Sequence, residues 1–266
     1  MDATLLDEQS QLPADFEETI HALAELGIRF APASGRPLYT LEELFPTLRD
    51  ELVFIGDNGG AIRWKGQNLF TSEMSPEGWR ALNRLTREQG DIAVLCGLES
   101  AYVERPFAVH DAVLRHFYTK IEYVDRLEDV AAPADKFTIY LPQHNAQQAY
   151  DTVYASQRSI YSVAVAGECW VDIMNPGVHK GAALQTLGQL WGLPSESIMA
   201  FGDTYNDAEM LQTVRYGFLM ENGSEPLRQK VPFLAPSHRE AGVMQVLHRV
   251  LAQNGCVCPE DFVPAH

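Results

Sequence analysis

The sequence predicts an α/β fold in which a parallel sheet, covered by helices on both faces, carries a second α/β unit inserted within it. Short apolar strands alternate with amphipathic helices near both ends of the chain, a pattern typical of parallel sheets. This rhythm changes after about residue 75 and resumes at Lys180, which indicates an insertion. The 266 residues suit one large or two ordinary domains.

The segments that flank the insertion predict the parallel sheet. Phe16, Ile20 and Leu23 recur at near-helical spacing and Gly27 follows them as a stop, which predicts the first helix. We expect, in chain order, helix 13–26, strand 28–33, helix 41–48, strand 52–55, a helix from residue 180, strand 198–201, helix 207–213, strand 216–220 and helix 241–253.

The inserted unit has apolar faces of its own, so it is expected to fold as a separate α/β domain. Its expected elements are helix 78–88, strand 92–96, helix 107–119, strand 136–141, helix 145–156 and strand 160–165.

Charge and composition exclude several classes of protein. The chain carries 36 Asp and Glu against 20 Lys and Arg, a net charge of −16, and no basic cluster, so we expect neither nucleic acid nor a membrane surface as partner. There is no spanning apolar run, and the first ten residues do not resemble a signal peptide, so the expected compartment is cytoplasmic. The four cysteines are too few and too scattered for a disulfide framework. Cys256 and Cys258 are either an ordinary pair of thiols or half of a metal site, for which the sequence offers no second Cys or His pair at ligand spacing.

Four places at strand ends or helix starts carry polar groups. They are Asp2 with Thr4, the run Ser34-Gly35-Arg36, Lys180, and the run from Gly202 to Asp207. Ligands of parallel sheets bind beyond the carboxyl ends of the strands. Together these places offer carboxylates for a hard cation, a hydroxyl and amides for phosphoryl oxygens, and one lysine, which are the groups that phosphoryl transfer requires.

Each place taken alone also has a simpler explanation. Asp2 fits a solvated surface residue, Ser34-Gly35 a turn, and Lys180 a solvated charge at a helix start. The run from Gly202 to Asp207 is more informative, because several carboxyl and amide groups before an apolar helix are costly unless they are solvated or bound to a cation.

The order of these four places resembles the four-motif signature of the haloacid dehalogenase superfamily, and more narrowly the Cof-type phosphatases. That resemblance implies a Rossmann-like parallel-sheet core (1–75 and 176–266) and an inserted α/β cap domain (76–175). Segments within the cap are similar to those of bacterial sugar phosphatases that also release phosphate from flavin mononucleotide. The segments that carry the resemblance are residues 33–36, 58–61, 96–102, 136–142, 176–181, 202–211 and 237–243.

The resemblance implies a phosphate monoesterase that uses Mg²⁺ and an aspartyl-phosphate intermediate. Asp203 and the backbone carbonyl of Asp2 would bind the metal, and Asp207 would orient Lys180 or a metal-bound water. The Asp2 side chain would act as general acid and base.

The same resemblance assigns the phosphate site. Ser34, Gly35 and Arg36 would hold the phosphoryl group, Lys180 would neutralise its charge, and Asn206 would contact the substrate or the phosphate.

The first motif departs from the family pattern Asp-x-Asp-x-Thr. Aligning Asp2 and Thr4 on its second Asp and its Thr places the nucleophilic Asp one residue before Met1, on a strand that the printed chain lacks. We therefore expect a protein that starts several residues earlier; a truncated, inactive relative is the alternative. Ala3 stands where the family usually has Gly, which a negative φ would tolerate.

The expected function is hydrolysis of small phosphorylated metabolites, with sugar phosphates as the first substrate class and flavin mononucleotide as the second. The alternative is a non-catalytic member that binds a phosphorylated ligand or a protein partner. A phosphomutase is disfavoured because no additional acid/base pair is visible. The sequence does not indicate an oligomeric state.

Overall fold

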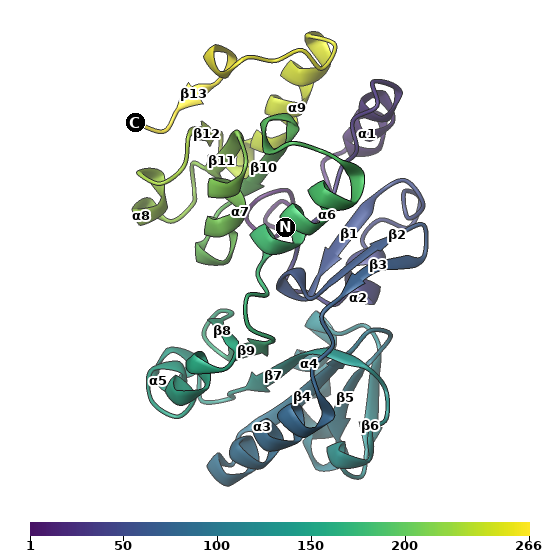
Figure 1. The fold of residues 1–266 in the computed structure, drawn as a ribbon, viewed down its shortest axis with the longest axis vertical. Coiled ribbons are helices and arrows are strands. Elements are labelled where there is room, and N and C mark those ends of the chain that lie inside the picture. Colours follow the sequence, from purple (N-terminus) through teal and green to yellow (C-terminus); the bar gives the residue numbers. More distant parts are fainter. The chain divides into compact units, whose positions relative to one another are not determined.

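The computed structural model describes residues 1–266, and the chain divides by its contacts into two compact units (Figure 1). The first unit comprises Met1–Ala33, Asp50–Val53 and His179–His266. The second unit comprises Ser34–Arg49 and Phe54–Val178. These units are defined by contacts between residues, so they do not test the expected bounds of the core and cap domains, which stay a prediction. No helix of the chain combines the length and the apolar character that crossing a bilayer requires.

The first unit contains a four-stranded sheet in the order β10-β11-β12-β13. The first three strands are parallel, and β13 is antiparallel to β12. The strands are β10 (Met199–Gly202), β11 (Tyr216–Met220), β12 (Phe233–Ala235) and β13 (Val263–Pro264). The helices are α1 (Phe16–Glu25), α6 (Lys180–Trp191), α7 (Ala208–Thr213), α8 (Glu225–Arg228) and α9 (Gly242–Ala252).

Local sequence places two of the expected site residues in this unit. The His179 side chain accepts a hydrogen bond from the amide of Ala182, so α6 begins at Lys180, and Gly192 ends the helix with φ of 65°. The strand β10 ends at Gly202, so Asp203 directly follows the carboxyl end of a parallel strand.

The second unit contains a three-stranded sheet, β1-β2-β3, apart from Val53 at the start of β1, and a six-stranded sheet in the order β6-β5-β4-β7-β9-β8. The strands are β1 (Val53–Gly56), β2 (Ala61–Trp64), β3 (Gln67–Thr71), β4 (Ile92–Gly97), β5 (Ala101–Glu104), β6 (Ile121–Val124), β7 (Ala134–Tyr140), β8 (Ser162–Val165) and β9 (Trp170–Met174). The helices are α2 (Leu38–Glu42), α3 (Pro76–Gln89), α4 (Asp111–Phe117) and α5 (Ala146–Asp151).

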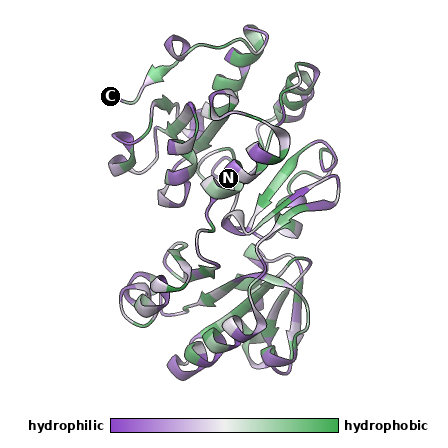
Figure 2. Ribbon diagram, in the orientation of Figure 1, coloured by the Kyte–Doolittle hydropathy of each residue, from purple (hydrophilic) through white to green (hydrophobic).

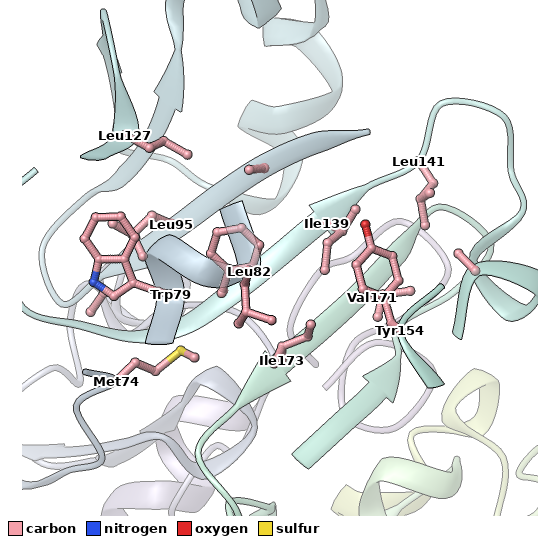
Figure 3. Close-up of a cluster of buried hydrophobic side chains, with 14 of the residues drawn as sticks. Met74, Trp79, Leu82, Leu95, Leu127, Ile139, Leu141, Tyr154, Val171 and Ile173 are labelled. Carbon is pink, nitrogen blue, oxygen red and sulfur yellow. The ribbon is translucent and has the colours of Figure 1, made fainter. Parts of the chain in front are cut away.

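The helix α3 shows how the six-stranded sheet is covered. Ser75 caps its first turn by accepting from the amide of Gly78. Its apolar side, with Trp79 and Leu82, joins a buried cluster that includes Leu95 of β4 and Ile139 of β7 (Figure 3). Figure 2 shows hydrophilic residues along one side of α3, the side that does not join this cluster.

The α/β class and the parallel core sheet are confirmed, but several expected elements need correction. The expected strand 28–33 does not form; Ala33 makes a single bridge, and the Val53 amide donates to the Phe30 carbonyl at 3.2 Å. These contacts are too few for a regular ladder. Expected helix 41–48 is instead α2, which starts after Pro37 and ends before Pro46, a residue that cannot donate a helical hydrogen bond.

Two helices of the inserted segment are shorter than expected. Expected helix 107–119 is a 3₁₀ turn, Arg105–His110, followed by α4. Expected helix 145–156 is α5 followed by a second 3₁₀ turn, Ala155–Ser159. The sequence reading also missed several short elements, namely β2, β3, β5, β6, β9, β12, β13 and α8.

Candidate active site

Thr4 and Asp203 meet in the first unit although 199 residues separate them. The Thr4 hydroxyl donates to Asp203 Oδ1 at 2.6 Å. Burial raises the pKa of the Asp203 carboxyl, and the negative charge of Asp207 raises it further, against the Thr4 hydrogen bond. Asp203 is thus a partly buried carboxylate whose charge the surrounding groups compensate only in part.

Asp207 joins Lys180 to the same cluster. Lys180 Nζ donates to Asp207 Oδ1 at 2.6 Å, and Asp207 Oδ2 accepts from the amides of Asp203 and Thr204 at 3.0 and 3.3 Å. Burial alone would raise the pKa of Asp207, but the charge of Lys180 lowers it below its usual value. The structure therefore holds Asp207 as an anion that fixes both the Lys180 ammonium and the start of the loop at Asp203.

The N-terminal loop lies against this cluster. Burial and the nearby charge of Lys180 lower the pKa of the Met1 α-amino group, and the charges of Asp207 and Asp203 oppose them. The carbonyl of Ala3 accepts from Asn222 Nδ2 at 2.8 Å. Asp203, Lys180 and Asp207 thus surround the point at which the printed chain begins.

Ala3 does not have the negative φ that its substitution for Gly requires. Its φ is 54°, in the left-handed region where a Cβ is strained. Ala3 therefore lacks the negative φ that would let it replace glycine without strain, and the loop is strained at this residue.

Asp2 and Asn206 lie at the edges of the cluster. Asp2 is an exposed residue. Asn206 is half-buried in the 3₁₀ turn Tyr205–Asp207, between Asp203 and α7. Their predicted roles in acid–base chemistry and substrate contact stay predictions.

Ser34, Gly35 and Arg36, called the Ser34 loop below, belong to the second unit. Ser34 is buried, and its Oγ accepts from the Arg36 amide at 3.1 Å. The amides of Asp57 and Asn58 donate to the Arg36 and Ser34 carbonyls, each at 2.9 Å. The loop is therefore held along its backbone by the residues that follow β1.

The first unit offers hard oxygen atoms to a metal ion. Asp203 supplies a carboxylate and Asp2 a backbone carbonyl, whereas both oxygens of Asp207 accept hydrogen bonds from Lys180 and from amides. No set of three or more His, Cys, Asp or Glu side chains is arranged to hold a metal. These donors fit Mg²⁺ in kind, because Mg²⁺ prefers oxygen and usually keeps several waters.

The sequence reading missed a second buried charged cluster, which lies behind the Ser34 loop. It consists of Lys136, Asp57 and Asp172, whose side chains are at most 5% exposed. A signal existed, because a lysine in a strand that continues with Phe137 and Ile139 has to find a partner once the strand is buried. Two of the segments that carry the family resemblance adjoin this cluster: segment 136–142 begins at Lys136, and segment 58–61 directly follows Asp57.

Comparison with known proteins gives the chain its family. The haloacid dehalogenase-like hydrolase family matches residues 1–247. A 5-amino-6-(5-phospho-D-ribitylamino)uracil phosphatase of Escherichia coli is 30% identical over 255 residues, covering 94% of each chain. An HMP-PP phosphatase of Cronobacter sakazakii is 30% identical over 243 residues, covering 88% of this chain and 86% of its own.

Solved structures show the same fold. A protein of Streptococcus mutans superposes with a TM-score of 0.86 at 28% identity, covering 95% of this chain and 97% of its own. A sugar phosphatase of haloacid dehalogenase subclass IIB superposes with a TM-score of 0.79 at 20% identity, covering 94% and 96%. The chain therefore belongs to the haloacid dehalogenase-like hydrolase family, and within that family it is a phosphatase.

Proposed function

We propose that this phosphatase is a Mg²⁺-dependent monoesterase that hydrolyses small phosphorylated metabolites through an aspartyl-phosphate intermediate. The observation that carries the proposal is the buried Lys180–Asp207 pair beside the partly buried carboxylate of Asp203, at the carboxyl end of β10. A fixed ammonium next to a carboxylate suited to a hard cation is an arrangement that stabilises charge on a phosphoryl group.

Each residue of the first unit has a role in this proposal. Asp203 and the Asp2 carbonyl would hold Mg²⁺, which supplies positive charge to the phosphoryl oxygens when bound. Lys180, oriented by Asp207, would neutralise further charge on the same oxygens. The carboxyl of Asp2 would protonate the leaving oxygen and then accept a proton from the hydrolytic water.

The remaining roles concern the phosphoryl group and the nucleophile. Ser34, Gly35 and Arg36 would bind phosphoryl oxygens, and Asn206 would contact the substrate. The nucleophilic Asp would stand immediately before Met1, next to the cluster that surrounds the Met1 amine.

The names of the relatives support a phosphorylated polyol or sugar as substrate. The Escherichia coli relative is named for a compound with a 5-phosphoribityl chain. Flavin mononucleotide carries the same phosphorylated ribityl chain, so it and the sugar phosphates are the first compounds to assay. The name of the Cronobacter relative adds HMP-PP to the panel.

The experiment compares three chains: the printed chain, a chain with a short apolar segment ending in Asp placed before Met1, and the same extension ending in Asn. Hydrolysis of p-nitrophenyl phosphate is measured with Mg²⁺ and with EDTA. We expect Mg²⁺-dependent turnover by the Asp chain alone. Equal turnover by the printed chain would refute the position of the nucleophile, and phosphate binding without turnover by any chain would favour a non-catalytic binding protein.

A further inference from the structure

Lys136 is a buried lysine directly behind the Ser34 loop. It lies on β7, and its side chain is 2% exposed. Its Nζ donates to the Gly35 carbonyl at 2.6 Å and lies 2.9 Å from Asp57 Oδ1 and 3.6 Å from Asp172 Oδ2. One ammonium group thus joins strand β7 to the loop and to two carboxylates.

The carboxylates around Lys136 are fixed in turn. Asp172 Oδ1 accepts from the Thr138 hydroxyl at 2.8 Å, and Asp172 Oδ2 accepts from Asn58 Nδ2 at 2.9 Å. Asp57 and Asn58 have φ values of 50° and 55°, which are uncommon for residues with a side chain. Strained backbone of this kind persists where the surrounding structure holds it, and it is concentrated at functional sites.

Stability does not explain why these charges are buried. Taking one ammonium and two carboxylates out of water costs several kilocalories per mole for each ion, and an apolar replacement of a buried ion pair is often equally stable. Burial would lower the pKa of Lys136, yet the charges of Asp172 and Asp57 raise it well above its usual value. The strand therefore keeps a positive charge at a buried position between Asp135 and Phe137, which are buried as well.

The peptide group between Gly35 and Arg36 connects this charge to Ser34. Its carbonyl oxygen accepts from Lys136, and its amide donates to Ser34 Oγ at 3.1 Å. The two groups of one planar trans peptide point in opposite directions, so fixing the carbonyl also fixes the amide. Hydrogen bonds linked in this way strengthen one another, and a hydroxyl oxygen that accepts an amide proton keeps its own proton to donate.

We propose that Lys136 is a positioning residue for phosphate recognition, which acts through the Gly35–Arg36 peptide to orient the Ser34 hydroxyl as a donor. The inference rests on the proposed role of Ser34 as a ligand of the phosphoryl group. Lys136 does not touch the phosphate itself. Its effect should therefore disappear when the Ser34 hydroxyl is absent.

The test is a double-mutant cycle on phosphate binding, measured with inorganic phosphate and Mg²⁺ by calorimetry, so that turnover is not needed. We expect Lys136→Met to weaken phosphate binding by roughly 10-fold, the lower end of the range for residues that orient a ligand group. Ser34→Ala should weaken it as well, and the double variant should bind about as tightly as Ser34→Ala alone. A further tenfold loss in the double variant would overturn the proposal.

Arg63 provides the matched control. It is a buried cation of the same unit whose ion-pair partners are Glu42 and Glu99. Arg63→Met should leave phosphate affinity unchanged, and an equal loss in this variant would show that Lys136 has only a structural role. If Lys136→Met does not fold, Lys136→Met/Asp57→Asn tests the same contact with one fewer unpaired carboxylate.

The outcomes separate this inference from the proposed function. The cycle is therefore measured in the chain extended by a segment ending in Asp. If this chain, with Lys136 unchanged, binds no phosphate, the proposed function fails. If it binds phosphate and its folded Lys136 variants bind phosphate equally well, only the positioning role of Lys136 fails.

Discussion

Lys180 Nζ lies 2.6 Å from Asp207 Oδ1, and neither side chain is more than 5% exposed. A buried pair of this kind is sensitive to the loss of one partner, because the other charge then remains in a low-dielectric environment without compensation.

We predict that Lys180→Gln reduces turnover of the Asp-extended chain by roughly 10²–10³-fold, the range for removing one donor to developing charge. The free energy of unfolding should fall by about 3–5 kcal/mol, because Asp207 is left buried and unpaired. Steady-state kinetics and urea unfolding measure the two effects. Lys180→Gln/Asp207→Asn should recover most of the stability without recovering activity; recovery of both would contradict the role of Lys180.

Removing the metal should abolish activity of the Asp-extended chain. Asp203→Asn should raise the Mg²⁺ concentration needed for half-maximal activity by at least about tenfold, because an amide oxygen is a weaker ligand for a hard cation than a carboxylate oxygen. Its cost in stability should be small, because burial already raises the pKa of this carboxyl and disfavours its charge. A Mg²⁺ titration of activity and a urea titration check both statements. Unchanged Mg²⁺ dependence would remove Asp203 from the metal site.

Ala3→Gly should stabilise the chain by about 1 kcal/mol, because it removes the left-handed strain of an alanine at φ 54°. Ala241, with φ of 52°, provides an independent second site for the same change. Ala252 is an exposed residue of α9, where glycine should instead cost about 0.5–1 kcal/mol. Urea unfolding of the three variants gives the signs, and a loss of stability in Ala3→Gly would contradict the strain.

Asp135 predicts a pH dependence in the second unit. It is fully buried with both carboxylate oxygens unpartnered, and burial followed by the charge of Asp57 raises its pKa well above the ordinary value. Its contribution to stability is therefore complete below the unfolded pKa of 3.8 and is lost as pH rises through the folded pKa. Asp135→Asn should gain stability over the wild type as pH rises from 4 to 7, in thermal or urea unfolding.

Asp111 is the control of opposite sign. A hydrogen bond from Tyr123 lowers the pKa of this carboxyl, so its contribution is present above pH 3.8 and is lost as pH falls through the folded pKa. Asp111→Asn should thus lose stability at pH 7 and little at low pH. A pH-independent difference between Asp135→Asn and the wild type would show that Asp135 ionises normally.

The sequence predicted the part of the site that depends on local signals. Lys180 follows a capping histidine, and Asp203 and Asp207 follow the glycine that ends a strand, so their places in the fold can be inferred from neighbouring residues. The hydrogen bond between Thr4 and Asp203 joins distant segments, and only the ordered resemblance to a family suggested that they meet.

The cluster around Lys136 could not be predicted in the same way. Asp172 faces Thr138 because β9 pairs with β7 in one register, and hydropathy patterns do not specify which strands pair. The turn at Asp57 and Asn58 has positive φ at two residues other than glycine, which propensities disfavour. Strand 28–33 was predicted from its apolar run, but such a run does not say whether a neighbouring ladder exists.

Two of the five lysines, Lys136 in the second unit and Lys180 in the first, are buried in ion pairs, whereas Lys65, Lys120 and Lys230 are exposed. An amine-acylating reagent should therefore label three positions at once and reach the other two only when their unit opens. Each compact unit thus contains one intrinsic chemical reporter of its own unfolding, which mass spectrometry can follow without any added probe.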